Sequence, residues 1–189
     1  DQTDPSEFGR EVHALLAGDL SPDTAAPEAL RLAAAFHAGD WGRRAALADR
    51  VEREQGFLIS LDGRLVSGQI DLWFRHDGET VVLDYKTDAV SAEQVPGRAA
   101  AYELQLRLYA LAVERLAATP VDRAILYFLR PNIPVEVAVD PAALAAARLR
   151  VEELFQAQDR LDFPLRTGPH CRFCPHFGAL CPAPRMPDP

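Results

Sequence analysis

Two alternating apolar segments joined by an Asp-Gly turn restrict the folds open to this chain. Residues 68–74 and 80–86 are rich in β-branched, aromatic and aliphatic side chains, and Asp77-Gly78 lies between them. Segments of this kind predict strands, and an Asp-Gly pair between two such strands predicts a tight hairpin. The sequence therefore predicts an antiparallel pair with a defined register.

That register brings two acids together. Centring the turn between Asp77 and Gly78 places Asp71 opposite Asp84, and Lys86, two residues further on, lies on the same face as Asp84. Directly opposed carboxylates destabilise a sheet unless a cation lies near both. A hard divalent ion such as Mg²⁺ or Mn²⁺ meets that need and could activate a water molecule for hydrolysis. The alternative is a solvated strand face on which Lys86 is an ordinary ion-pair partner.

Lys86 is also the only lysine of the chain, whose other basic positions are all arginine. An ammonium is a compact point charge, whereas a guanidinium is a wide planar fork, so the two are not interchangeable in a tight site. The pattern favours a specific task for Lys86, such as orienting a water or neutralising developing charge. A GC-rich genome would be an alternative reason for the scarcity of lysine.

The rest of the chain predicts helices and strands in alternation. An earlier hairpin is expected from Phe57 to Val66, and residues 88–98 are expected to form an irregular loop. Helices are predicted at 5–17, 26–38, 42–51, 98–117 and 141–158, and further strands at 121–129 and 135–139. An antiparallel meander that leads into a crossover helix predicts an α/β fold with a mixed central sheet flanked by helices. We expect one domain over 1–162 and a Cys-rich tail over 163–189 that packs on it.

Length and charge exclude some classes of protein. The 189 residues suit a single domain, and no apolar run approaches the roughly 18 residues of a membrane span, so we expect no membrane association. The formal net charge of −8 is unusual for a free-standing nucleic-acid binder, which normally carries a basic patch. If DNA is the substrate, a neighbouring domain or partner should supply much of the binding. The opening at Asp1, without an initiator Met, is typical of an excised domain.

The acids and the lysine lie in motifs that resemble a known family. Residues 68–72, GQIDL, followed by residues 83–88, LDYKTD, are similar to the core of PD-(D/E)xK nucleases, and within them to the RecB-like branch at the C-termini of AddA and RecB helicase–nucleases. The resemblance extends from about residue 6 to about residue 130. It implies a restriction-endonuclease-like core in which Asp71 and Asp84 bind metal, Lys86 assists the water and Tyr85 supplies a backbone metal contact.

Two helical motifs strengthen the resemblance. Residues 8–13, FGREVH, are similar to an early helix of the family whose histidine is a metal ligand, which implies that role for His13. Gln105 and Tyr109 match the family's Q-x-x-x-Y motif and, being four residues apart, share one helix face. The resemblance implies that they shape the site or touch the substrate. Without it, all three would be ordinary helix-surface groups. Glu54, just before the first hairpin strand, is a candidate for supporting the metal ligands and not for binding the metal itself.

The resemblance implies a cytoplasmic, Mg²⁺- or Mn²⁺-dependent deoxyribonuclease. We expect exonucleolytic hydrolysis of single-stranded DNA, as part of a helicase–nuclease machine for DNA repair and recombination. The alternatives are a catalytically silent nuclease fold that binds DNA or a partner, and a stand-alone single-strand exonuclease.

The three cysteines, Cys171, Cys174 and Cys181, have the spacing C-x2-C-x6-C. A C-x2-C turn aims both sulfurs at one point and favours a soft metal over a secreted disulfide framework. The trio is similar to that of iron–sulfur variants of the same family, which hold a 4Fe–4S cluster with one more upstream cysteine. This chain lacks that cysteine. A zinc site completed by His170 or His176, and an unoccupied tail of reduced thiols, are the alternatives.

Overall fold

The computed structural model describes residues 5–168, 171 and 174–183, and its chain divides into two compact units, Asp1–Arg150 and Val151–Pro189. The α-helices are α1 (Pro5–Ala17), α2 (Pro27–Ala38), α3 (Asp40–Ala46), α4 (Val95–Ala99), α5 (Glu103–Ala117) and α6 (Pro141–Asp159). The strands are β1 (Arg50–Leu61), β2 (Arg64–His76), β3 (Glu79–Lys86), β4 (Arg123–Phe128) and β5 (Ile133–Val137). Short 3₁₀ turns, η1 (Pro22–Thr24) and η2 (Ala92–Gln94), precede α2 and α4.

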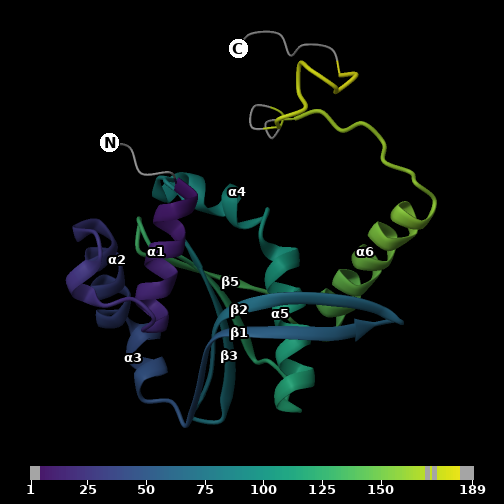
Figure 1. Ribbon diagram of the computed structural model, residues 1–189. Helices are drawn as coiled ribbons and strands as arrows, with labels where there is room; N and C mark the ends of the chain where they lie inside the picture. Colours follow the sequence, from purple (N-terminus) through teal and green to yellow (C-terminus); the bar gives the residue numbers. More distant parts are fainter. Residues whose placement is uncertain (1–4, 169–170, 172–173, 184–189) are drawn as a thin grey trace. The chain divides into compact units, whose positions relative to one another are not determined.

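The first unit is built on a five-stranded sheet in the order β1-β2-β3-β4-β5 (Figure 1). All neighbouring strands are antiparallel except β3 and β4, which are parallel and are connected through α5. A parallel pair needs such a crossover, because its second strand must start from the same edge as the first. The predicted α/β fold with a mixed central sheet is therefore confirmed.

Helices cover both faces of this sheet, so the central strands are buried on both sides. Helices α1, α2 and α3 pack on one face around a continuous apolar cluster that includes Val12, Phe36, Phe74 and Leu83. Helix α5 packs against β3 and β4. Because both faces are covered, an acid on either one lies in a low-dielectric setting, where its negative charge is unfavourable unless it is paired.

Both predicted Asp-Gly turns are present. Asp62 and Gly63 have φ values of 50° and 84°, and Asp77 and Gly78 have φ values of 53° and 82°. Positive φ at both central residues is the geometry of the hairpin turns that match strand twist, and Asp-Gly adopts it readily. The second hairpin has the expected register, with Trp73 paired to Val82 and Leu72 to Leu83.

Several element boundaries differ from the predicted ones. Helix α3 ends at Ala46 and does not reach Val51, because residues from Arg50 onward pair with β2 as the start of a long β1. Strand β2 is continuous across residues 64–76, so the two predicted hairpins share one strand. The loop predicted at 88–98 contains η2 and most of α4, and the helix predicted from residue 98 begins as α5 at Glu103. Strand β5 begins at Ile133 and includes Pro134, which an edge strand tolerates because its outer N–H needs no partner.

The second unit, by the division at Arg150 and Val151, begins within α6 and continues into the cysteine segment. The predicted boundary between 162 and 163, and the predicted packing of the tail on the domain, stay predictions. None of the helices in the described part of the chain is long and apolar enough to cross a membrane.

Helix α3 approaches the end of α2 so closely that Gly42 has no room for a side chain. A Cβ built at Gly42 would lie 2.2 Å from the Phe36 carbonyl oxygen and 2.6 Å from the His37 Cα. We expect Gly42→Ala to lower the free energy of unfolding by about 1–3 kcal/mol, because backbone would have to move.

The matched control is Gly97→Ala in α4, where a Cβ would meet no atom within 4 Å. This substitution should leave stability unchanged or raise it by up to about 1 kcal/mol, since alanine favours helix. Urea denaturation of both variants measures the difference. Equal effects would contradict the packing described for α2 and α3.

Candidate active site

A pocket of about 660 Å³ opens where β2 and β3 separate. Helix α1, the first three strands, the segment after β3 and helix α5 all contribute to its wall. Its polar lining includes His13, Glu54, Gln69, Asp71, Asp84, Lys86, Asp88, Tyr102, Gln105 and Tyr109. The structure therefore brings together the residues that the sequence predicted for the nuclease site.

The two aspartates lie at a fork in the sheet. The β2–β3 pairing begins at Leu72 and Leu83, one pair short of the predicted pairing of Asp71 with Asp84. Asp71 Oδ2 instead accepts a hydrogen bond of 2.8 Å from the backbone N–H of Tyr85. Strand β3 meanwhile continues beside β4 as far as Lys86. The Asp71 side chain thus takes the place of a backbone acceptor at the point where the strands separate.

Asp84 is deeply buried, with 1 % of its surface exposed, and Asp71 is 8 % exposed. These values exclude a solvated strand face for the acid pair. Tyr85, between Asp84 and Lys86, points the other way, into the apolar cluster under α1 and α2. The backbone metal contact predicted at Tyr85 stays a prediction.

Three potential ligands converge beside the fork. His13 Nδ1 lies 3.5 Å from Asp71 Oδ1 and 3.6 Å from Glu54 Oε1. Both distances are longer than the usual range for N–H···O hydrogen bonds. Ligand atoms of the three residues all lie within 4.8 Å of one another. They point at a common space at distances too long for strong hydrogen bonds, which is the arrangement that a shared ion requires.

Glu54 is the site residue whose position the sequence analysis underestimated. Its neighbours Arg53 and Gln55 pair with Leu72 and Ile70, so Glu54 stands across from Asp71. Its φ of 47° is rare for a residue other than glycine, and such strained residues cluster at functional sites. The Gln69 amide donates a hydrogen bond of 3.0 Å to the Glu54 carbonyl oxygen. Extending the register of the first hairpin beyond Phe57 would have placed Glu54 opposite Asp71.

Lys86 links the acids to helix α5. Its Nζ lies 2.7 Å from Asp84 Oδ2 and donates a hydrogen bond of 3.1 Å to Gln105 Oε1. The Gln105 amide in turn donates a hydrogen bond of 2.7 Å to the Tyr109 hydroxyl. In this structure the Q-x-x-x-Y pair therefore reaches the acids through Lys86.

Tyr102 is a pocket residue that the sequence analysis missed. Its ring centroid lies 4.1 Å from Lys86 Nζ. The signal was present, because Tyr102, Gln105 and Tyr109 are spaced by three and four residues, which is the spacing of one helix face. Tyr102 lies outside the Q-x-x-x-Y motif, however, and within the predicted unbroken helix it had no distinguishing feature.

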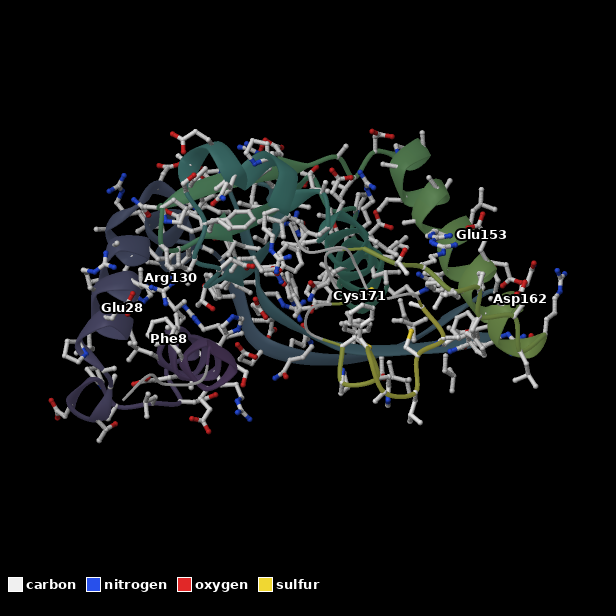
Figure 2. The ribbon with its side chains drawn as sticks, turned by 90° about the horizontal axis from the view of Figure 1, so that it is seen from above. Phe8, Glu28, Arg130, Glu153, Asp162 and Cys171 are labelled. Atoms are coloured by element: carbon white, nitrogen blue, oxygen red, sulfur yellow. The ribbon has the colours of Figure 1, made fainter. Side chains whose placement is uncertain are left out.

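Arg130 fixes the chain just beyond the site. Its Nε donates a hydrogen bond of 2.9 Å to the Thr87 carbonyl, directly after Lys86. The same guanidinium forms an ion pair with Glu28 of α2 and lies 4.8 Å from the Phe8 ring centroid of α1 (Figure 2). One side chain thereby joins the end of β3 to two of the helices that cover this face of the sheet.

The residues present fit a divalent cation. Glu54 Oε1 is buried and has no hydrogen-bond partner within the described residues, and the Lys86 ammonium, 2.7 Å away, is the cation that faces the buried Asp84 Oδ2. Buried carboxylate oxygens without such partners are strongly unfavourable unless a cation compensates them. Carboxylate oxygens are the preferred donors for Mg²⁺ and Mn²⁺, and an imidazole is an acceptable addition for a transition ion.

Comparison with known families agrees with this geometry. The model of the PD-(D/E)XK nuclease superfamily matches residues 1–182. The chain belongs to the PD-(D/E)XK nuclease superfamily. The family resemblance predicted from the Asp71, Asp84 and Lys86 motifs is confirmed.

Relatives of this nuclease chain are much longer proteins. It is 36 % identical over 124 residues to an ATP-dependent helicase/nuclease subunit from Bacillus pumilus, covering 55 % of this chain and 10 % of that protein. It is 33 % identical over 163 residues to the subunit of the same name from Desulforudis audaxviator, covering 66 % of this chain and 13 % of that protein. The nuclease chain thus spans about a tenth of the length of these relatives.

A solved structure supports the fold independently. A Eubacterium rectale protein named as a candidate exonuclease superposes with a TM-score of 0.54 at 10 % identity, covering 89 % of this chain and 78 % of that one. At this level of identity the likeness concerns the fold alone.

The cysteine segment of the nuclease chain carries three free thiols. The backbone N–H of Cys174 donates to the Cys171 carbonyl at 3.2 Å, and the N–H of Gly168 lies 3.4 Å from Cys171 Sγ. Cys171 is buried, and Cys174 and Cys181 are half-buried. Within the described ranges, the three sulfurs do not all lie within 4.8 Å of one another, whereas the ligand atoms of His13, Glu54 and Asp71 do. His170 lies outside the described residues, and a cluster or zinc ion at this segment stays a prediction.

Proton binding in the nuclease pocket reflects its surplus of negative charge. Burial, followed by the charge of Asp71, raises the pKa of Asp84 to about 7, although Lys86 opposes the shift. Burial lowers the pKa of His13, but the carboxylates of Asp71, Glu54 and Asp84 together raise it above its ordinary value. Both side chains therefore tend to retain a proton in the absence of another cation.

A metal ion must displace those protons, so its affinity should depend on pH. We expect Mn²⁺ binding to weaken by about tenfold for each pH unit below 7, the approximate pKa of Asp84, with a further loss from His13. Above that pH the dependence should flatten. Isothermal titration calorimetry between about pH 6 and about pH 8 measures the slope.

Asp84→Asn removes the main proton competitor together with one ligand. This variant should bind Mn²⁺ more weakly at the high end of the range and show a shallower slope. An affinity for the wild-type protein that does not change with pH would contradict the assignment of Asp84 as a metal ligand.

Proposed function

We propose that this nuclease domain hydrolyses DNA phosphodiester bonds with Mg²⁺ or Mn²⁺. The observation that carries the proposal is the convergence of His13, Glu54 and Asp71 beside the buried Asp84–Lys86 ion pair, with Glu54 Oε1 buried and without a hydrogen-bond partner among the described residues. Lys86 supplies a single positive charge beside the three carboxylates of Glu54, Asp71 and Asp84, so this ion pair does not balance the charge of the site. Oxygens left open toward a shared pocket are suited to an ion that the protein acquires from solution.

The proposed ligands are His13, Glu54, Asp71 and Asp84, with the backbone of Tyr85 as a further contact. A bound divalent ion would polarise the phosphodiester and make its own water more acidic. Lys86 would direct its ammonium at the attacking water or at a phosphoryl oxygen, where charge develops during the reaction. Gln105 and Tyr109 would hold Lys86 in that direction and shape the wall against which the nucleotide lies.

We infer the biological setting from the relatives and from the charge. The helicase/nuclease subunits to which the chain is similar, and its net charge of −8, support a domain that receives DNA from a helicase domain or partner. We propose exonucleolytic cleavage of single-stranded DNA during cytoplasmic repair and recombination. A stand-alone exonuclease would require the chain by itself to bind DNA despite its acidity.

Substitution of the acid and the lysine tests the chemistry. We expect Asp84→Asn and Lys86→Arg each to lower the rate of DNA cleavage by about 10²-fold or more, because each removes a group that acts on the developing charge. Lys86→Arg is informative because it keeps the positive charge but not the compact ammonium. The assay measures cleavage of end-labelled single-stranded DNA with Mn²⁺ or Mg²⁺.

The matched control is Asp77→Asn, at the exposed hairpin turn of the same strand pair. Cleavage by this variant should match that of the wild-type protein. The product lengths distinguish exonucleolytic from endonucleolytic cleavage. Full activity of Asp84→Asn would refute the proposed site, and activity that appears only after a helicase partner is added would rule out the stand-alone alternative.

We also propose that Cys171, Cys174 and Cys181 bind a structural metal centre. The support is the C-x2-C spacing and the backbone hydrogen bond from the Cys174 N–H to the Cys171 carbonyl. Anaerobically purified protein should contain either iron and sulfide with visible charge-transfer absorption, or one zinc ion without colour. Cys174→Ser should lose that metal while Mn²⁺ binding at the nuclease pocket persists, and wild-type protein without iron or zinc would refute the proposal.

A further inference from the structure

Tyr102 occupies the break between α4 and α5, where its ring faces the Lys86 ammonium. Helix α4 ends at Ala99 and α5 begins at Glu103, and Tyr102 is the residue that precedes α5. The ring centroid lies 4.1 Å from Lys86 Nζ, well within the range of a cation–π contact. An ammonium has three N–H bonds, and among the described residues Lys86 contacts the Asp84 carboxylate, the Gln105 amide oxygen and this ring.

The Tyr102 ring is itself held by two charged side chains. Its hydroxyl lies 3.1 Å and 3.2 Å from the two carboxylate oxygens of Asp88. Arg98 Nε donates a hydrogen bond of 2.6 Å to Asp88 Oδ1, and another nitrogen of Arg98 donates to the Tyr102 hydroxyl. The Arg98 guanidinium carbon also lies 4.8 Å from the ring centroid. The ring therefore has little freedom to rotate away from Lys86.

These contacts connect two segments of the pocket wall. Asp88 follows Lys86 by two residues, where β3 has ended, while Arg98 and Tyr102 lie around the α4–α5 break. The three residues thus fasten the segment after β3 to the start of α5. Asp88 and Tyr102 both line the nuclease pocket, so these contacts lie at the site itself.

We propose that Tyr102 is a positioning residue that fixes the direction of the Lys86 ammonium through its ring face, while Asp88 and Arg98 hold the ring in place. The inference rests on the proposed function of Lys86 and adds a residue outside the Q-x-x-x-Y motif. Without the ring, one side of the ammonium faces solvent, and the flexible lysine stem can leave the reactive direction. The ring acts on the rate of the chemical step and not on the binding of DNA or metal.

The test compares Tyr102→Leu with Tyr102→Phe in the full chain. We expect Tyr102→Leu to lower kcat for single-stranded DNA cleavage by about 3- to 30-fold, the range that a lost cation–π contact gives. The KM for DNA and the Kd for Mn²⁺ should change by less than about twofold, since neither binding step uses the ring. Tyr102→Phe keeps the ring and should recover most of the lost rate.

The single lysine supplies a readout that needs no catalysis. Protein labelled with ¹³C at the lysine ε-carbon gives the Cε–Hε signal of Lys86 alone, and protons over a ring face are shifted upfield. The Lys86 Hε signal should be upfield in wild-type protein and in Tyr102→Phe, and should move to its ordinary position in Tyr102→Leu. Asp88→Asn, which loosens the ring without removing it, should give an intermediate shift and an intermediate kcat.

The outcomes separate this inference from the proposed function. An unshifted Lys86 signal in wild-type protein, or a Tyr102→Leu variant with wild-type kcat, overturns the positioning role. A raised KM with unchanged kcat also overturns it, because the ring would then contact the DNA. Wild-type protein that cleaves no DNA either alone or with a helicase partner refutes the proposed function, while the Lys86 shifts still decide the contact. If Tyr102→Leu does not fold, Asp88→Asn decides both readouts.

Discussion

Buried carboxylates that face one another without enough positive charge between them govern the organisation of this nuclease domain. Asp71 and Asp84 are both buried, Glu54 joins them from the adjacent strand, and the nearest protein cations are Lys86 and a histidine. Such an arrangement costs folding free energy that the surrounding packing must supply. The helices and the five-stranded sheet provide that packing, and they hold the acids where repulsion would otherwise separate them.

The rigid parts of the fold point at the same place. The acids come from strands, the histidine from α1 and Gln105 from α5, so most of the site depends on elements whose backbone is fixed by the sheet and its packing. Arg130 adds a direct link between the end of β3 and both α1 and α2. Sites built on such elements hold their geometry more closely than sites built on loops. The fold that this chain shares with its family therefore holds the pocket residues on strands and helices.

Much of this arrangement could be predicted from the sequence, and the exceptions have physical reasons. Asp-Gly turns fix register, so the nearness of Asp71 and Asp84 followed from local chemistry alone. The start of β1 could not be predicted in this way, because the apolar residues of 42–51 are also spaced as in a helix. Pairing with β2 from Arg50 onward overrides that helical pattern. Glu54 was underestimated because the first strand was predicted to begin at Phe57, so the register of that hairpin was not extended as far as Asp71. Tyr102 was missed because the helical apolar pattern of the sequence continues across residues 100–102, although the structure breaks the helix there. The contacts of Tyr102 with Asp88 and Arg98 at this break are not visible in the apolar pattern.

The β1–β2–β3 meander has a consequence for the order of folding. Glu54, Asp71 and Asp84 all lie on this meander, whose two tight turns bring its strands together at small loop-closure cost, whereas His13 must be joined across a much longer stretch of chain. Local contacts form faster than distant ones. We therefore expect the three acids to come together before His13 reaches them, so that their mutual repulsion has to be overcome early in folding.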